Sequence, residues 1–234
     1  MTWFWNRRAR FLVFAVVVAG IASSCQRQHP IKVKIDPAFE TGSEKIAVFP
    51  FLTAIHEAED PDGLASATMN KYFKPALDGR KDYKFISPNT LSYAVEQNDL
   101  GAGYRKFVAE YPKSGKADPE FLGALADALR CDAFLIPVVD MWQKDEVDYQ
   151  ENATPSTFVG ASIVVVDRTG SKVLFHASDE NYIEGAPSEA GDRGVISSAG
   201  RVRSDEGAKT HRAPPYEEVA IMVINALVGS LPTR

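Results

Sequence analysis

The stretch HEAEDPDG, residues 56–63, concentrates side chains that could bind a metal ion. It holds one imidazole and four carboxylates: His56, Glu57, Glu59, Asp60 and Asp62. Such groups are ligands for zinc and calcium, but the spacing matches neither an EF-hand loop nor a zinc motif. Acidic residues before a helix also complement its dipole, and Asp62 is in place to cap one. We therefore predict a structural role, with no metal and no other cofactor.

Three further residues carry nucleophilic or basic side chains without a supporting pattern. Cys131 lies between apolar segments and is predicted to be a small buried residue. Ser162, in GAS, lacks the second glycine of a nucleophile elbow, and His176 ends a predicted strand. No dinucleotide, phosphate-loop or metalloprotease motif occurs. The sequence therefore predicts no catalytic residue and no enzyme, although a secreted or anchored hydrolase with an unrecognised site stays open.

The N-terminus reads as a bacterial secretion signal. Three arginines precede an apolar run over residues 11–22, which is shorter than the ~20 residues that a membrane-spanning helix needs. The ASSC that follows resembles the lipobox, in which small residues precede a cysteine that receives a diacylglycerol. We predict a signal peptide over residues 1–24, cleavage between Ser24 and Cys25, and acylation of Cys25 as the membrane anchor, including palmitate. Ordinary secretion with cleavage nearby is the alternative, because Ala22 stands where the lipobox usually has leucine.

The residue after that cysteine bears on the location. Gln26 is not the aspartate that retains many such lipoproteins in the inner membrane of Gram-negative bacteria. The resemblance therefore implies the outer membrane, on its periplasmic side.

The composition of the mature chain limits its partners. Removing residues 1–24 leaves 23 basic and 31 acidic residues, a formal charge of −8. That balance disfavours nucleic acid, whose phosphates attract clustered lysine and arginine. About 210 residues form one well-buried domain, and two cysteines provide no disulfide framework.

The middle of the chain alternates strand and helix patterns. IKVKID, EKIAVFPF, YKFIS and DAFLIPVVDMW read as strands. Helices are predicted after Ser87 and after Asp118, each an N-cap followed by proline. An earlier helix in GLASATMNKYFKPAL has an apolar stripe made of Leu64, Thr68, Tyr72, Phe73, Ala76 and Leu77.

The last third predicts a hairpin and a final helix. FVGASIVVVDRTGSKVLFHAS is two strands joined by a turn in which Gly170 takes a positive φ. Val164 and Val166 then share one face of the sheet and Val165 the other. Residues 141–157 and 185–215 are predicted to be long mobile loops, and YEEVAIMVINALVGSLP an amphipathic helix.

Together these elements predict an α/β fold. We expect a single domain with a mixed β-sheet flanked by helices, over residues 44–234, after a linker and tether over residues 25–43. The predicted core includes Ile46, Val48, Phe51, Phe134, Leu135, Val164, Val166 and Leu174.

Three segments resemble a known superfamily: KIAVFPF, LADALRCDAFLIPVV and SIVVVDRTGSKVLF. They are similar to the α/β domain shared by the curli secretion channel lipoprotein, the lipoprotein activator of penicillin-binding proteins and the N-terminal domain of TolB. The resemblance covers residues 44–182 and the final helix, and departs from the pattern at Cys131, at Pro137 and at an apparent insertion over residues 101–117.

This resemblance implies an outer-membrane lipoprotein that binds envelope components in assembly or transport without catalysis. A channel is excluded, because the candidate loops are acidic and lack an apolar stripe. We expect an envelope protein partner to contact the loops, with Tyr149 and Tyr182 as anchors at their edges. Homo-oligomerisation is left open.

Overall fold

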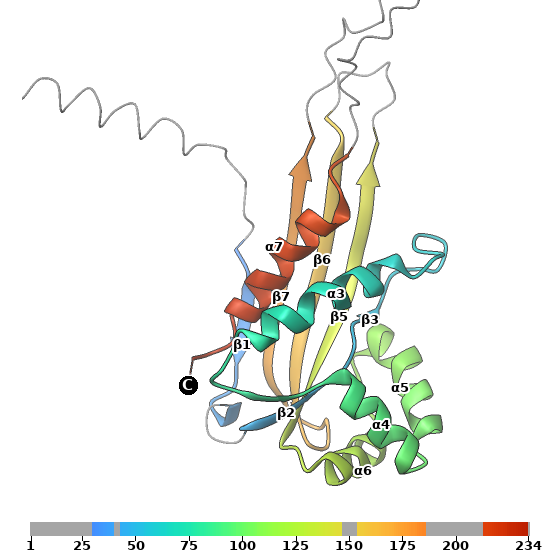
Figure 1. Ribbon diagram of the computed structural model, residues 1–234, viewed down its shortest axis with the longest axis vertical. Helices are drawn as coiled ribbons and strands as arrows, with labels where there is room; N and C mark the ends of the chain where they lie inside the picture. Colours follow the sequence, from blue (N-terminus) through green and yellow to red (C-terminus); the bar gives the residue numbers. More distant parts are fainter. Residues whose placement is uncertain (1–29, 40–42, 147–153, 186–212, 234) are drawn as a thin grey trace, which may run out of the picture.

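The computed structural model describes residues 30–39, 43–146, 154–185 and 213–233. In these residues one mixed sheet has helices on both faces (Figure 1), which confirms the predicted α/β class and its C-terminal helix. The strand order is β1-β7-β6-β5-β2-β4, and β3 pairs with β5.

The sheet combines parallel and antiparallel pairs. Its strands are β1 (Lys32–Ile35), β2 (Lys45–Val48), β3 (Leu52–Thr53), β4 (Lys84–Ile86), β5 (Ala133–Asp145), β6 (Ser156–Asp167) and β7 (Val173–Glu184). The β2–β4, β2–β5 and β3–β5 pairs are parallel, and the others are antiparallel. Gly170 has φ 71° in the β6–β7 turn, as predicted, and a Cβ there would lie 2.5 Å from the Ala117 Cβ.

The described helices are α3 (Leu64–Asp78), α4 (Pro88–Gln97), α5 (Gly101–Ser114), α6 (Pro119–Leu129) and α7 (Tyr216–Gly229). The predicted caps of α4 and α6 are confirmed. Ser87 Oγ accepts the Thr90 N–H at 3.3 Å, and Asp118 Oδ1 accepts the Glu120 N–H at 3.1 Å. These side chains satisfy backbone donors that a helix start leaves without partners.

Each face of the sheet is covered by its own helices. α3 and α7 lie across one face (Figure 1), while α4, α5 and α6 pack against the other. Val165 is buried on the α3–α7 side, and Val166 lies on the opposite side with Val164 packed beside it. The predicted alternation in the hairpin is confirmed, but Val164 is only partly buried and does not belong to the core.

The sheet is larger than predicted. Residues 25–43 were expected to be a linker and tether, yet the segment IKVKID, predicted to be extended, forms β1 and pairs with β7, and Phe39 is fully buried. The expected loop over residues 141–157 is also wrong at both ends, because β5 continues to Asp145 and β6 begins at Ser156. Hydrogen bonding to β6 holds the polar end of β5 extended despite its weak apolar pattern. Residues 147–153 and 186–212 of the two predicted loops lie outside the described residues.

Two helices also differ from the expectation. Most of the apparent insertion over residues 101–117 forms α5, which ends at Ser114. In α3 the buried residues are Ala65, Met69, Phe73 and Leu77, and Leu64, predicted to be on the apolar stripe, is 56% exposed. At the start of this helix Asp60, and not Asp62, accepts the N–H groups of Leu64 and Ala65.

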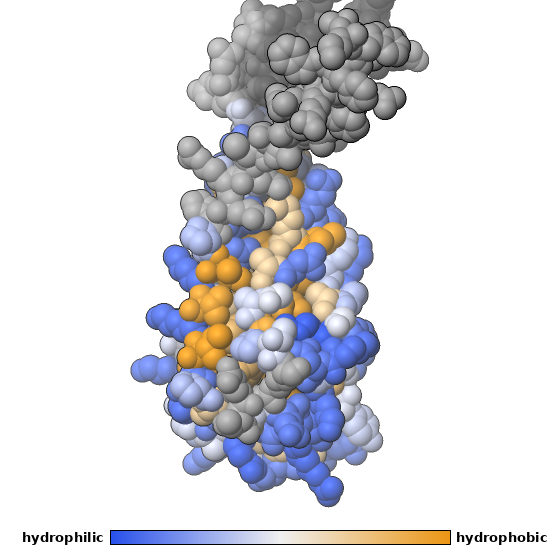
Figure 2. Space-filling view, turned by 90° about the vertical axis from the view of Figure 1, so that its left-hand side faces the viewer, coloured by the Kyte–Doolittle hydropathy of each residue, from blue (hydrophilic) through white to orange (hydrophobic). Residues whose placement is uncertain are grey.

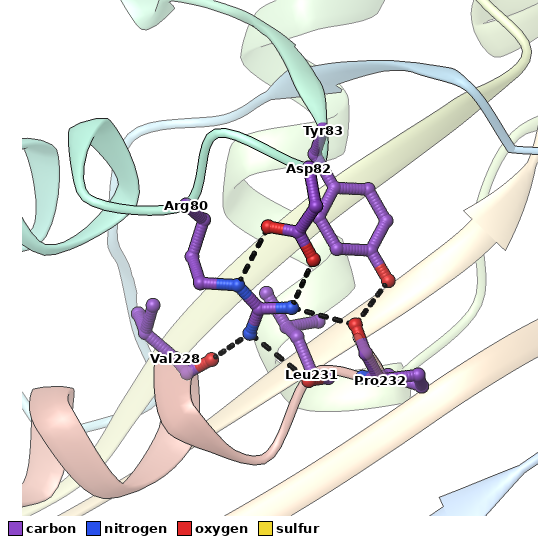
Figure 3. A network of polar contacts seen from close by, with 6 residues as sticks. All are labelled: Arg80, Asp82, Tyr83, Val228, Leu231 and Pro232. Atoms are coloured by element: carbon purple, nitrogen blue, oxygen red, sulfur yellow. Dashed lines mark hydrogen bonds and ion pairs between the residues drawn. The ribbon is translucent and has the colours of Figure 1, made fainter. Parts of the chain in front are cut away.

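A polar network fixes the end of α7 against the segment after α3 (Figure 3). The Arg80 guanidinium donates to the carbonyl oxygens of Val228 at 2.8 Å and Leu231 at 2.9 Å. It also donates to the Pro232 carbonyl at 2.6 Å, which accepts the Tyr83 hydroxyl at 2.8 Å. Its ion pair with Asp82 raises the pKa of Arg80. A cation at a helix C-terminus complements the dipole and satisfies the last carbonyls.

Candidate partner-binding surface

The strands β5, β6 and β7 extend beyond their neighbours and form an arm (Figure 1). The arm consists of residues 140–145, 156–161 and 179–184. β1 pairs only with residues 175–178 of β7, and β3 pairs with β5 only at Val138 and Val139. Within the described residues, both outer strands of the arm therefore have no neighbour on their outer edges. Free strand edges and side chains on both faces make the arm a candidate for recognition.

One face of the arm is closed by α7. The rings of Trp142 and Tyr216 are stacked, with centroids 4.1 Å apart and an interplanar angle of 8°, and Lys144 Nζ lies 4.8 Å from the Tyr216 centroid. The Thr157 hydroxyl donates to the Pro214 carbonyl at 2.5 Å. Burial raises the pKa of Tyr216. These contacts hold the start of α7 on the arm, and this face is structural.

The opposite face of the arm has an aromatic pair that no described helix covers. Phe158 and Tyr182 lie opposite each other in the β6–β7 register, with ring centroids 5.3 Å apart and an interplanar angle of 23°. Both are half-buried and belong to neither core cluster. We call this surface, formed by Met141, Phe158, Gly160, Glu180 and Tyr182, the open arm face. The Phe158 and Tyr182 rings stack on each other and stay partly exposed to solvent.

A glycine keeps the centre of the open arm face flat. A Cβ on Gly160 would lie 2.8 Å from Asp140 Oδ1 and 2.9 Å from the Met141 Cβ. The irregularity between Val139 and Met141 brings β5 this close to β6. The exposed carboxyl-bearing residues Asp140 and Glu180 flank the glycine, so the aromatic pair lies beside negative charge.

Of the predicted site residues, Tyr182 lies on this face, whereas Ser24, Cys25 and Tyr149 lie outside the described residues. Sequence analysis missed Phe158 and Trp142. Phe158 could have been found by counting from the Gly170 turn, since equal distances from the turn pair it with Tyr182. Trp142 ends the predicted strand DAFLIPVVDMW, where it overlaps the loop predicted from residue 141, and its contact with α7 depends on tertiary packing.

The other candidate residues have structural environments. Cys131 is buried, as predicted, and burial raises the pKa of its thiol to about 11, so it is protonated near neutral pH. Burial and the nearby Lys34 lower the pKa of His176. Ser162 is half-buried in β6 and faces Ser178 across the strand pair.

Side chains of the acidic stretch before α3 accept hydrogen bonds from nearby backbone N–H groups. His56 Nδ1 accepts the Ala58 N–H at 3.2 Å, and the Asp60 carboxylate accepts the Leu64 and Ala65 N–H groups at 2.8 and 3.0 Å. Among the described side chains, no group of three or more His, Cys, Asp or Glu is arranged to hold a metal ion. The predicted structural role fits these contacts, with Asp60 in place of Asp62.

The chain is an α/β domain with one mixed sheet. Several solved structures resemble it weakly. A PelC dodecamer from Paraburkholderia phytofirmans matches with a TM-score of 0.44 and 13% identity, over 88% of this chain and 99% of that chain. Lipoprotein GNA1162 from Neisseria meningitidis matches with a TM-score of 0.37 and 18% identity, over 60% and 83%. The LpoB C-terminal domain from Salmonella enterica matches with a TM-score of 0.31 and 11% identity, over 61% and 83%.

No family model matches the chain, and no curated protein matches it. Among the described helices, none has both the length and the apolar character to cross a bilayer.

Proposed function

We propose that this chain is a periplasm-facing lipoprotein, anchored through acylated Cys25 in the outer membrane, that binds an envelope protein in assembly or transport without catalysis. The lipobox resemblance supports the anchor, and the half-exposed aromatic pair of the open arm face supports the binding role. Tyrosine and phenylalanine supply large, rigid contact area and are enriched at interfaces.

The arm suits recognition because its side chains are held in place. β6 is paired on both sides along its whole length, and α7 supports the face opposite the aromatic pair. Binding to a rigid surface costs little conformational entropy. The open arm face is therefore preorganised. The outer edge of β7 beside it has no described strand neighbour, although the Tyr182 N–H donates to Asn181 Oδ1 at 3.0 Å.

The anchor is tested by mass spectrometry of the purified membrane protein. We expect an N-terminus at Cys25 carrying acyl chains, and a Cys25→Ala protein that leaves the membrane fraction. An unmodified N-terminus at another residue would exclude the anchor.

The binding surface is tested by photo-crosslinking in cells. A photoreactive amino acid replaces Tyr182 in one protein and Tyr93 in a matched control, because Tyr93 is a 62% exposed tyrosine on α4, away from the arm. We expect an envelope protein to be crosslinked at Tyr182 and not at Tyr93. Equal crosslinking at both positions would contradict the proposal, as would none at either.

A second experiment separates the open arm face from the segment that follows it. Replacing both Phe158 and Tyr182 by alanine removes the aromatic pair, and deleting residues 188–212 removes most of the predicted loop. We expect the double substitution to abolish capture of the crosslinked partner while circular dichroism shows a folded domain. Loss of capture only in the deletion protein would move the binding site to the loop.

A further inference from the structure

The edge strand β1 alternates lysine with apolar residues, and all four of its residues are exposed. Val33 and Ile35 are 38% and 47% exposed, and Val173 at the start of β7 is 54% exposed. Figure 2 shows the side of the molecule on which β1 lies, where hydrophobic surface gathers among hydrophilic residues. We call β1 together with Val173 the β1 edge.

The β1 edge presents two kinds of chemistry. Lys32 and Lys34 lie opposite Ser178 and His176 on one face of the sheet, whereas Val33 and Ile35 lie on the other face. In the described part of the chain, Lys32 and Lys34 form no ion pair, while the nearby Lys172 binds Asp36 at 2.9 Å. Basic and apolar side chains therefore project from one edge.

A groove continues this edge. It has a volume of about 330 Å³ and is lined by Lys34, Ile35, Asp36, Pro37, Val173, Leu174 and His176. Its apolar walls next to a lysine suit an amphipathic ligand, since apolar surface enters the acyl boundary while lysine reaches the phosphates.

The short distance along the chain between Cys25 and β1 bears on what the β1 edge contacts. Lys32 is seven residues after Cys25, and seven extended residues span at most about 24 Å. An anchor at Cys25 would thus hold the β1 edge close to the bilayer. We propose that the β1 edge rests on the lipid surface, with Val33, Ile35 and Val173 at the headgroup boundary and the two lysines toward anionic phosphates. This proposal depends on the Cys25 anchor proposed above.

A second copy of the chain fits the edge less well. Antiparallel pairing of two β1 strands in a register that continues both faces of the sheet would place Lys32 opposite Lys34, and like charges on paired strands are destabilising. Lysine on edge strands is a common means of preventing such pairing. Anionic lipid, in contrast, attracts each lysine near its surface. Charge therefore favours the bilayer as the occupant.

The test measures depth with the lipidated full-length protein in vesicles of phosphatidylethanolamine containing about a quarter phosphatidylglycerol. A fluorescent label is placed at Val33→Cys or, as the control, at Tyr93→Cys on the far side of the sheet. Cys131 is buried and does not react with the label. With nitroxide-bearing lipids, we expect quenching about three times greater at Val33 than at Tyr93. Equal quenching would overturn the proposal.

Vesicle flotation separates this proposal from the anchor. Protein that fails to float lacks the anchor, whereas protein that floats with equal quenching has the anchor but not the contact. Adding Lys32→Glu and Lys34→Glu should leave flotation unchanged and reduce quenching at Val33 toward the Tyr93 value. Energy transfer between labelled copies at Val33 that rises with protein density, without lipid quenching, would assign the edge to a second copy and overturn the proposal.

Discussion

Arg80 offers the sharpest test of how the fold is held together. Arg80→Ala removes the donors to the carbonyls of Val228, Leu231 and Pro232 and leaves the Asp82 carboxylate without its ion-pair partner. The two side chains of the ion pair are only 16% and 19% exposed. Removing one member of a buried ion pair costs about 3–5 kcal/mol, and partial access of water reduces this to about 2–4 kcal/mol here. For a domain of this size the melting temperature should fall by about 4–16 °C.

The measurement is thermal and urea unfolding, monitored by circular dichroism, with two comparison variants. Arg80→Lys keeps the charge but not the fork of donors, so its loss should be smaller. Lys74→Ala removes a surface ion pair with Asp78, whose side chains are 66% and 60% exposed, and should change stability by less than about 0.5 kcal/mol. An Arg80→Ala protein that melts like the Lys74→Ala protein would refute the assigned role.

Further predictions concern the backbone and a turn. In urea unfolding, Gly160→Ala should destabilise the protein by about 1–3 kcal/mol, because the new Cβ would contact the Met141 Cβ too closely. Gly123→Ala in α6 should stabilise the protein by about 0.5–1 kcal/mol, because its Cβ has no atom within 4 Å and alanine favours the helix. Asp118→Ala should lower the free energy of unfolding by about 1 kcal/mol, because α6 loses its N-cap. Asp118→Asn, which keeps a capping oxygen, should be as stable as the parent. Burial raises the pKa of Asp167, but hydrogen bonds from the β6–β7 turn outweigh it and hold that pKa below its usual range. The ionised carboxylate therefore stabilises the fold. The difference in unfolding free energy between the parent and Asp167→Asn should have its full value above about pH 4 and shrink as the pH falls further. A difference that does not change with pH would contradict this assignment.

The elements that sequence analysis predicted correctly have local causes. Ser87 and Asp118 start their helices through side-chain hydrogen bonds to the next turn, and Gly170 is needed where φ is positive. The final helix follows from its apolar periodicity. Such features depend on a few neighbouring residues, so the sequence alone was sufficient.

α5 was missed because tertiary packing forms it. Its N-cap, Leu100, makes no side-chain cap, and its first turn contains two glycines, which normally break helices. Gly103 is instead a point of close approach, since a Cβ there would lie 2.7 Å from the Phe121 ring. The ring of Phe107 packs against that of Phe49, the residue after β2, with a centroid distance of 4.8 Å. No local pattern reports such contacts.

The candidate surface was predictable only in part. Tyr182 was chosen because it is an aromatic residue near a loop, and it lies on the open arm face, but its pairing with Phe158 depends on the register of two twelve-residue strands. The segment IKVKID was predicted to be extended, but it was placed in the linker and tether over residues 25–43. All four residues of β1 are exposed, so only its pairing with β7 shows that this strand belongs to the sheet.

The two proposed surfaces are connected through β7. Residues 175–178 of this strand pair with β1, and Tyr182 follows His176 by six residues, or about 20 Å along a strand. If the β1 edge rests on lipid, the open arm face lies within about that distance of the bilayer. A partner that binds Tyr182 and Phe158 would then be held next to the membrane surface by a rigid strand. The proposed anchor, the β1 edge and the open arm face would thus combine into one arrangement, in which the domain holds its partner at the membrane.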